Sequence, residues 1–229
     1  MFQAARRKVN QARDVHIRSG AVMLEGELVL PENAKGVVLF AHGSGSSRHS
    51  PRNQFVAQTI REAGLGTLLF DLLTRDEEAV DRYSRHLRFD IGLLAERLVE
   101  ATSWVKGEID HLHAGYFGAS TGAAAALVAA SEVGEIVGAI VSRGGRPDLA
   151  GDALPFVKAS TLLIVGELDY PVIEMNKEAY ALLRCEKEIE IVSGASHLFE
   201  EPGALEEVAH LAANWFQAHL AGRTRVEGE

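Results

Sequence analysis

The sequence predicts an α/β fold, with a mostly parallel β-sheet and helices on both faces. Apolar runs typical of strands alternate with helical segments along most of the 229 residues, at a spacing that implies crossover connections. Several of these runs are apolar throughout, as in strands covered on both sides. The length suits one domain, and no repeat or long linker divides the chain. We therefore treat residues 1–229 as a single domain.

Composition and charge limit the classes of function. Hydrophobic residues make up 47% of the chain and charged residues 24%, which is typical of a globular protein in water. The formal net charge of -9 argues against broad binding to nucleic acid. No apolar run reaches the roughly 20 residues of a membrane span. The single cysteine, Cys185, cannot form an internal disulfide. We expect a cytoplasmic protein that binds neither nucleic acid nor membrane.

The first predicted element is an antiparallel pair of edge strands between Val15 and Leu30, where polar and apolar residues alternate before a turn. The basic segment ahead of it, residues 1–13, has no cleavage site of a targeting peptide. We interpret it as a strap or connecting segment. Residues 222–229 are expected to be loose.

The rest of the chain alternates between strands and helices. Further strands are predicted at 36–41, 65–70, 113–117, 136–141, 161–165 and 189–192. Helices are predicted at 51–63, 89–106, 121–132, 172–183 and 204–220. The sheet thus has about eight strands. The polar excursion at 72–88 is too short for a large cap domain. Within it, residues 74–81 form either an acidic surface loop or a mobile gate, and we favour the loop.

A candidate nucleophile lies between the strand at 113–117 and the next helix. The residues from Gly118 to Gly122 read Gly-Ala-Ser-Thr-Gly, and the strand-turn-helix layout is that of a nucleophile elbow. In this turn the backbone of Ser120 is expected to be strained, so that its hydroxyl stands clear of the strand. A Cβ at either glycine would collide where helix and strand cross.

Two titratable residues follow later strand ends, where reactive groups of open α/β sheets collect. Asp169 follows the strand that ends at residue 165, and His197 follows the strand that ends at residue 192. Each has a rival. Glu167 is an alternative acid, and Asp169 can instead simply cap the next helix. Among the other histidines, His42 has the best claim as base, but its place before Gly43 suggests support of the neighbouring loop.

The order Ser120, Asp169, His197 is that of the α/β-hydrolases, which the chain resembles from about residue 15 onward. More narrowly, the motifs HGSGSSRHSPRN at 42–53 and SRGGRPD at 142–148 are similar to the small, lidless, dienelactone-hydrolase-like branch. Members of that branch occur alone or joined to phosphoribosyltransferase domains. The resemblance implies the α/β-hydrolase fold. Dienelactone hydrolase itself uses cysteine as its nucleophile, so serine at position 120 favours a serine esterase.

The chemistry assigns a role to each of these residues. A serine hydroxyl needs a neutral imidazole to accept its proton, and His197 is the candidate base. Asp169 would orient the ring and stabilise the imidazolium. The backbone amides of Ser44 and Thr121 are the candidate oxyanion donors. No metal or organic cofactor is required. Four further residues are expected to support the site structurally: His42, Gly43, Gly118 and Gly122.

Four arginines follow strand ends and can approach the mouth of the same site. Arg48 and Arg52 begin the helix after residue 50, and Arg143 and Arg146 follow the strand at 136–141. They suit either a carboxylate or phosphate on the substrate, or ion pairs that brace the loops. The candidate ion-pair partners are Asp71, Asp76, Asp90 and Asp148. We favour bracing for Arg52 and Arg146, and both roles stay open for Arg48 and Arg143.

The predicted function is a serine hydrolase that cleaves carboxylic esters of small or water-soluble substrates through an acyl-enzyme. Hydrolysis of thioesters or lactones, or acyl transfer, on the same triad is the alternative. The alternative from another class of function is a non-catalytic interaction module that partners a phosphoribosyltransferase. The protein is expected to be a monomer or homodimer. One apolar helix face is expected to pack on the sheet rather than form a dimer contact; it consists of Val208, Leu211, Trp215 and Phe216.

Overall fold

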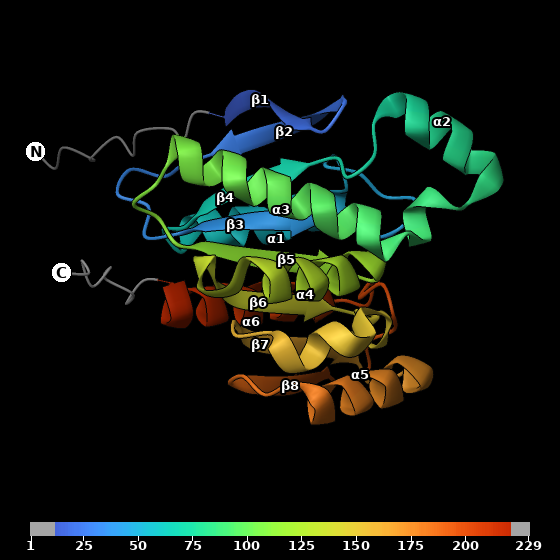
Figure 1. Cartoon of the computed structure of the whole chain (residues 1–229). Coiled ribbons are helices and arrows are strands. Elements are labelled where there is room, and N and C mark those ends of the chain that lie inside the picture. The colour runs from blue at the N-terminus through green and yellow to red at the C-terminus, as the bar shows by residue number, and fades with distance from the viewer. Residues whose placement is uncertain (1–11, 221–229) are drawn as a thin grey trace, which may run out of the picture.

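The computed structural model describes residues 12–220. Its sheet has eight strands in the order β1-β2-β4-β3-β5-β6-β7-β8 (Figure 1). The strands are β1 Ala12–Ser19, β2 Val22–Val29, β3 Val37–Ala41, β4 Gly66–Phe70, β5 Ala114–Ala119, β6 Val137–Arg143, β7 Ser160–Gly166 and β8 Lys187–Val192. β2 runs antiparallel to β1 and to β4, and the remaining pairs are parallel. The predicted α/β-hydrolase fold is confirmed, with one correction. Of the two strands predicted to lie at the edge, only β1 does so, because β2 also pairs with β4.

Helices cover both faces of the sheet. They are α1 Pro51–Glu62, α2 Arg75–Ser84, α3 Ile91–Glu108, α4 Thr121–Val133, α5 Tyr170–Leu182 and α6 Ala204–Leu220. Figure 1 shows α3, α4 and α5 in front of the sheet, with α1 and α6 behind it. Successive residues of β5 point to opposite faces, so Tyr116 is buried with α3 and α4 and Phe117 with α1 and α6. The apolar face of α6 packs on the sheet as expected, because Val208, Trp215 and Phe216 are buried there.

The acidic segment expected to be a surface loop is a helix, α2. A capping box begins it: Thr74 accepts a hydrogen bond from the amide of Glu77, whose carboxylate accepts from the amide of Thr74. Glu77 also accepts from Arg97 Nη1 of α3 at 2.7 Å. Figure 1 shows α2 beyond the carboxyl ends of the central strands. With the short 3-10 helix η1 (Leu87–Phe89), it forms the whole excursion between β4 and α3.

Two further 3-10 segments complete the connections, η2 at Gly134–Ile136 and η3 at Pro147–Phe156. The sequence pattern predicts no element at η3. Its pattern is interrupted, since Pro155 lies inside it and Gly151 has a positive φ of 49°.

The boundary between the predicted N-terminal strap and the first strand lies earlier than residue 13. The first strand begins at Ala12, and Arg13 is part of it and forms an ion pair with Glu108 at 2.8 Å. The rest of the predicted strap and the segment 222–229 lie outside the described residues. Across residues 12–220, no helix combines the length and apolar character that a membrane span requires.

Candidate active site

The turn from β5 to α4 holds Ser120 in a strained conformation, with φ 51° and ψ -121°. A non-glycine residue with positive φ persists only where its surroundings impose it. A Cβ added to Gly118 would lie 2.4 Å from the Cα of Ala123, and one added to Gly122 would lie 2.1 Å from the carbonyl oxygen of Ala41. Both glycines are therefore required by the close crossing of helix and strand, which fixes the serine at the end of β5.

The loops after β7 and β8 bring Asp169 and His197 together. His197 Nδ1 lies 2.6 Å from Asp169 Oδ2. The carboxylate is largely buried and the imidazole is partly exposed, with 13% and 40% of each side chain accessible. Asp169 precedes α5 at the N-cap position, but its side chain makes no capping hydrogen bond. The alternative that Asp169 merely caps a helix is therefore wrong, because its carboxylate faces the imidazole.

The rival acid, Glu167, is engaged elsewhere. Its carboxylate accepts hydrogen bonds from the amide of Gly194 at 2.7 Å and the hydroxyl of Ser193 at 2.9 Å. These two hydrogen bonds, of which the one from the Gly194 amide has the larger effect, lower the pKa of Glu167 below its ordinary value. Glu167 thus ties the end of β7 to the loop after β8 and leaves His197 to Asp169.

Ser120 and His197 line one cavity of about 270 Å³, which we call the serine cavity; its walls include Ser44, Arg52, Arg143 and Leu198. Within residues 12–220, the only polar side-chain contact of the His197 ring is with Asp169. The serine and the imidazole therefore share a cavity without a hydrogen bond between them. Such catalytic contacts are often long before substrate binds.

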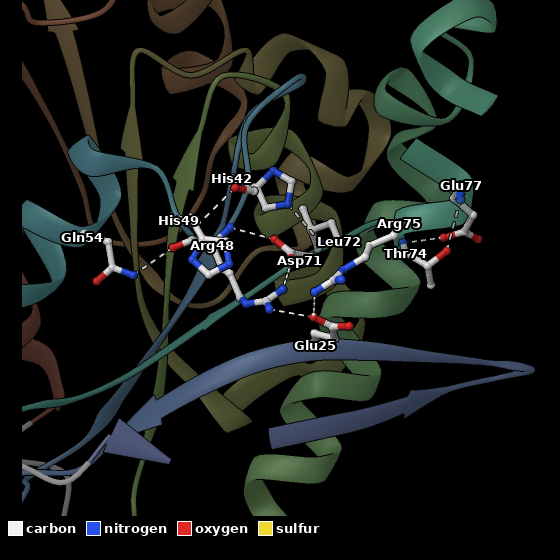
Figure 2. A network of polar contacts seen from close by, with 11 residues as sticks. Glu25, His42, Arg48, His49, Gln54, Asp71, Leu72, Thr74, Arg75 and Glu77 are labelled. Carbon is white, nitrogen blue, oxygen red and sulfur yellow. Dashed lines mark hydrogen bonds and ion pairs between the residues drawn. The ribbon is translucent and has the colours of Figure 1, made fainter. Parts of the chain in front are cut away.

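The rival base, His42, is a buried part of the framework. The amide of Leu72 donates to His42 Nε2 at 3.0 Å (Figure 2). Because that nitrogen accepts, Nδ1 carries the proton and donates to the carbonyl oxygen of Gly43 at 3.0 Å. Burial lowers the pKa of His42, which favours this neutral form. His42 therefore holds the loop after β3 against the residues that follow β4.

The residues of the two candidate oxyanion donors are in contact, and the amide of one, Ser44, already donates a hydrogen bond within the protein. The amide of Ser44 donates to the hydroxyl oxygen of Thr121 at 3.1 Å. Thr121 is buried and begins α4 directly after Ser120. The sequence motif indicated the Thr121 amide but not its side chain, whose hydroxyl oxygen accepts the hydrogen bond from the other candidate donor.

Three of the four arginines have carboxylate partners. Arg48 pairs with Asp71 and, at 2.7 Å, with Glu25 (Figure 2). Arg52 pairs with Glu200 at 2.9 Å. Arg48 therefore braces the loop after β3 against β2 and the end of β4. Its suggested role as a substrate ligand is wrong, because both ends of its guanidinium are occupied.

The same strand end carries one paired and one unpaired arginine. Arg146 forms two hydrogen bonds to Asp148, at 2.9 and 2.8 Å, so bracing is confirmed for it. Arg143 lines the serine cavity and is only 9% exposed. Its Nε and Nη1 are buried without a hydrogen-bond partner. Burial, together with the nearby charge of Arg52, lowers the pKa of Arg143 to about 10.

A second cavity, also of about 270 Å³, lies under α2, and we call it the α2 cavity. Leu72, Leu73 and Leu94 give it an apolar wall, and Glu78 and Arg88 are among its charged groups. It shares the loop at residues 43–46 with the serine cavity. The candidate oxyanion donors therefore stand between two separate spaces. In the part of the chain that the structure describes, no cluster of His, Cys, Asp or Glu is arranged to hold a metal ion.

The sheet order and the elbow with its following acid and histidine define an α/β-hydrolase. No protein-family model matches the sequence. Dienelactone hydrolase from Anabaena variabilis has 60% sequence identity to this chain, and its crystal structure matches with a TM-score of 0.91. The match covers 92% of this chain and 99% of that one. The chain therefore belongs to the dienelactone hydrolase family and is a hydrolase.

Other similar proteins share either the fold alone or only part of their length with this chain. Est1E from Butyrivibrio proteoclasticus is 14% identical with a TM-score of 0.75, over 90% of this chain and 98% of that one, and shares the fold. Two Mycobacterium tuberculosis proteins, whose names suggest a phosphoribosyl transferase, are each 54% identical over 211 residues. The match covers 91% of this chain and 47% of theirs. The chain thus spans about half the length of these curated relatives.

Proposed function

We propose that this hydrolase cleaves carboxylic esters of small or water-soluble substrates through an acyl-enzyme on Ser120. One observation carries the proposal: the 2.6 Å contact of His197 with Asp169 lies beside a strained serine in the same cavity. This combination of nucleophile, base and orienting acid is what serine-based acyl transfer needs.

In the proposed mechanism, Nδ1–H of His197 donates a hydrogen bond to the carboxylate of Asp169, which leaves Nε2 unprotonated as the base. Nε2 takes the proton of the Ser120 hydroxyl as its oxygen attacks the ester carbonyl. The imidazolium then protonates the departing alcohol, and the acyl group remains on the serine. A water molecule, deprotonated by the same nitrogen, then attacks the acyl carbonyl. The bond to the Ser120 oxygen breaks, the imidazolium returns the proton to that oxygen, and the acid leaves.

The oxyanion of each tetrahedral intermediate would be held by the amides of Thr121 and Ser44. The Ser44 amide now donates to the Thr121 hydroxyl, so this hydroxyl keeps the donor in place until the oxyanion takes over or shares the bond. Fixed donors matter because removal of one typically lowers kcat roughly 100- to 1000-fold.

The cavities support a small substrate. Each has a volume of about 270 Å³, and drug-sized ligands generally occupy pockets of roughly 300–1000 Å³. The cover over the site is α2 with η1 rather than a large cap. Thioesters and lactones of similar size would use the same residues and differ only in the leaving group.

A fluorophosphonate probe tests the proposal against the interaction-module alternative, which the half-length match to the curated relatives favours. The probe reacts with activated serines. We expect stoichiometric labelling of the folded protein at Ser120, with loss of labelling in Ser120→Ala. A folded protein that neither takes up the probe nor hydrolyses simple acetate esters would overturn the proposed function.

A further inference from the structure

One loop holds the backbone of the nucleophile from both sides. It consists of residues 143–146, at the end of β6, and we call it the β6 loop. The amide of Ser120 donates to the carbonyl oxygen of Arg143 at 3.4 Å, and the carbonyl oxygen of Ser120 accepts from the amide of Arg146 at 3.1 Å. A strained backbone persists only where its surroundings impose it. These two bonds therefore help to keep Ser120 at its φ of 51°.

The β6 loop also lies against the base. Gly144 has a positive φ of 49°, and a Cβ added to it would lie 3.0 Å from the carbonyl oxygen of His197 and 3.6 Å from Cε1 of its ring. A Cβ added to Gly145 would lie 2.6 Å from the Cβ of Ala123, in the first turn of α4. The loop thus packs between the helix that follows the serine and the segment that carries the histidine, so its position sets the separation of the two.

Asn176 of α5 anchors this loop. Its Nδ2 donates to the carbonyl oxygen of Gly145 at 3.0 Å and to that of Val172 at 2.8 Å. In the described part of the chain, no other group donates to the Gly145 carbonyl. Two successive glycines have few conformational limits, so the loop needs a contact of this kind to keep one position. α5 begins directly after Asp169, and the β6 loop is therefore tied to the elements of all three predicted triad residues.

Packing alone does not explain an asparagine at position 176. The residue is 0% exposed, and its Oδ1 has no hydrogen-bond partner. A buried polar atom without a partner lowers stability, and an apolar side chain would contain no such atom. What the carboxamide provides is its donor, which reaches the β6 loop.

We infer that Asn176 is a positioning residue, which fixes Ser120 relative to His197 by holding the β6 loop. Its effect passes through the Gly145 carbonyl and the Arg146 amide, and Asn176 itself does not line the serine cavity. A displacement of about 1 Å at a reacting group can lower the rate roughly 100-fold. The inference rests on the proposed function and adds a residue to the same site.

Two variants remove the donor in different ways. Asn176→Ala deletes the carboxamide, and Asn176→Asp keeps its shape but replaces the N–H groups with an oxygen. With p-nitrophenyl acetate, we expect each to lower kcat by about 10- to 100-fold and to change KM by less than about threefold, because Asn176 does not line the substrate cavity. The second-order rate of fluorophosphonate labelling at Ser120 should fall by a similar factor, since it depends on the same nucleophile and base.

The matched control is Thr102→Val in α3. Thr102 is buried and its hydroxyl contacts that of Tyr116, so this variant also leaves one buried oxygen without its partner. We expect it to lose stability in urea, as Asn176→Ala does, but to keep kcat within about threefold of the wild type. Equal falls of kcat in Thr102→Val and Asn176→Ala would overturn the inference, because they would reflect lost stability rather than lost position.

Hydrogen exchange locates the effect without relying on activity. The amides of Gly144 and Arg146 donate hydrogen bonds, so a peptide spanning residues 142–148 should exchange faster in Asn176→Ala, while α6 keeps its protection. Unchanged exchange in that peptide, or a labelling rate equal to that of the wild type, would overturn the inference and leave the esterase proposal intact. A folded wild type that takes up no probe would overturn the proposed function and the positioning role together.

Discussion

Replacing Arg143 with methionine is expected to stabilise the protein. Burial and the charge of Arg52 lower the pKa of Arg143 from the ordinary value of arginine to about 10. Each pKa unit corresponds to about 1.4 kcal/mol, so the buried charge costs on the order of 3 kcal/mol of folding free energy at neutral pH. Methionine fills a similar volume without charge, and exchanges of this kind gain roughly 1–4 kcal/mol.

The destabilisation caused by Arg143 depends on pH, and its sign is set by the lowered pKa of this residue. The unfolded chain holds the Arg143 proton more tightly than the folded protein. The cost in folding free energy is therefore fully present below a pH of about 10, and it declines as the pH rises from there toward the ordinary pKa of arginine in the unfolded chain. At neutral pH the whole difference between wild type and Arg143→Met should be measurable.

Urea and thermal unfolding at neutral pH provide the assay. We expect a gain of roughly 1–3 kcal/mol, which for a chain of this size raises Tm by roughly 2–4 °C per kcal/mol. Arg146→Met, which breaks a partly exposed ion pair with Asp148, should instead lose up to about 1 kcal/mol. A clear destabilisation of Arg143→Met would refute the reasoning, since it would mean that the guanidinium is held by compensating interactions within the fold.

Three other changes probe the site and its cover. Asp169→Asn should lower kcat roughly 1000- to 10,000-fold by disturbing the tautomer of His197, whereas Glu167→Gln should leave kcat within about threefold; similar losses in both would refute the assignment of the acid. Thr121→Val should lower kcat about tenfold or more by freeing the Ser44 amide, with rescue by Thr121→Ser, and an unchanged kcat would rule out the positioning role of the hydroxyl. Arg97, chiefly by its hydrogen bonds, lowers the pKa of Glu77 to about 2, so the stability from this pair should be present above pH 4.5 and lost as the pH falls toward 2. In an acid titration monitored by circular dichroism, Glu77→Gln should unfold at a higher pH than the wild type. Coincident curves would contradict the anchoring of α2 by this ion pair.

The sequence missed two features for different reasons. α2 has no apolar stripe, because it stands clear of the sheet, so hydrophobic periodicity could not detect it. The signal that could have found it is the capping box of Thr74 and Glu77. The second feature, the hydroxyl of Thr121, depends on a contact with Ser44 from 77 positions earlier, and no local pattern reports it.

The sequence by itself determined the sheet, the elbow around Ser120 and the strand-end positions of Asp169 and His197. These follow from local rules: apolar runs, small residues at a tight crossing and the direction of parallel strands. Only the tertiary structure decided which arginines are neutralised. Arg48 pairs with Glu25 of β2. Arg143 is buried without a partner, whereas Arg146, three positions later, is partly exposed and paired with Asp148. The pairs of Arg48 with Glu25 and of Arg52 with Glu200 join segments remote in the chain, and residue type and spacing do not specify the distances between such segments.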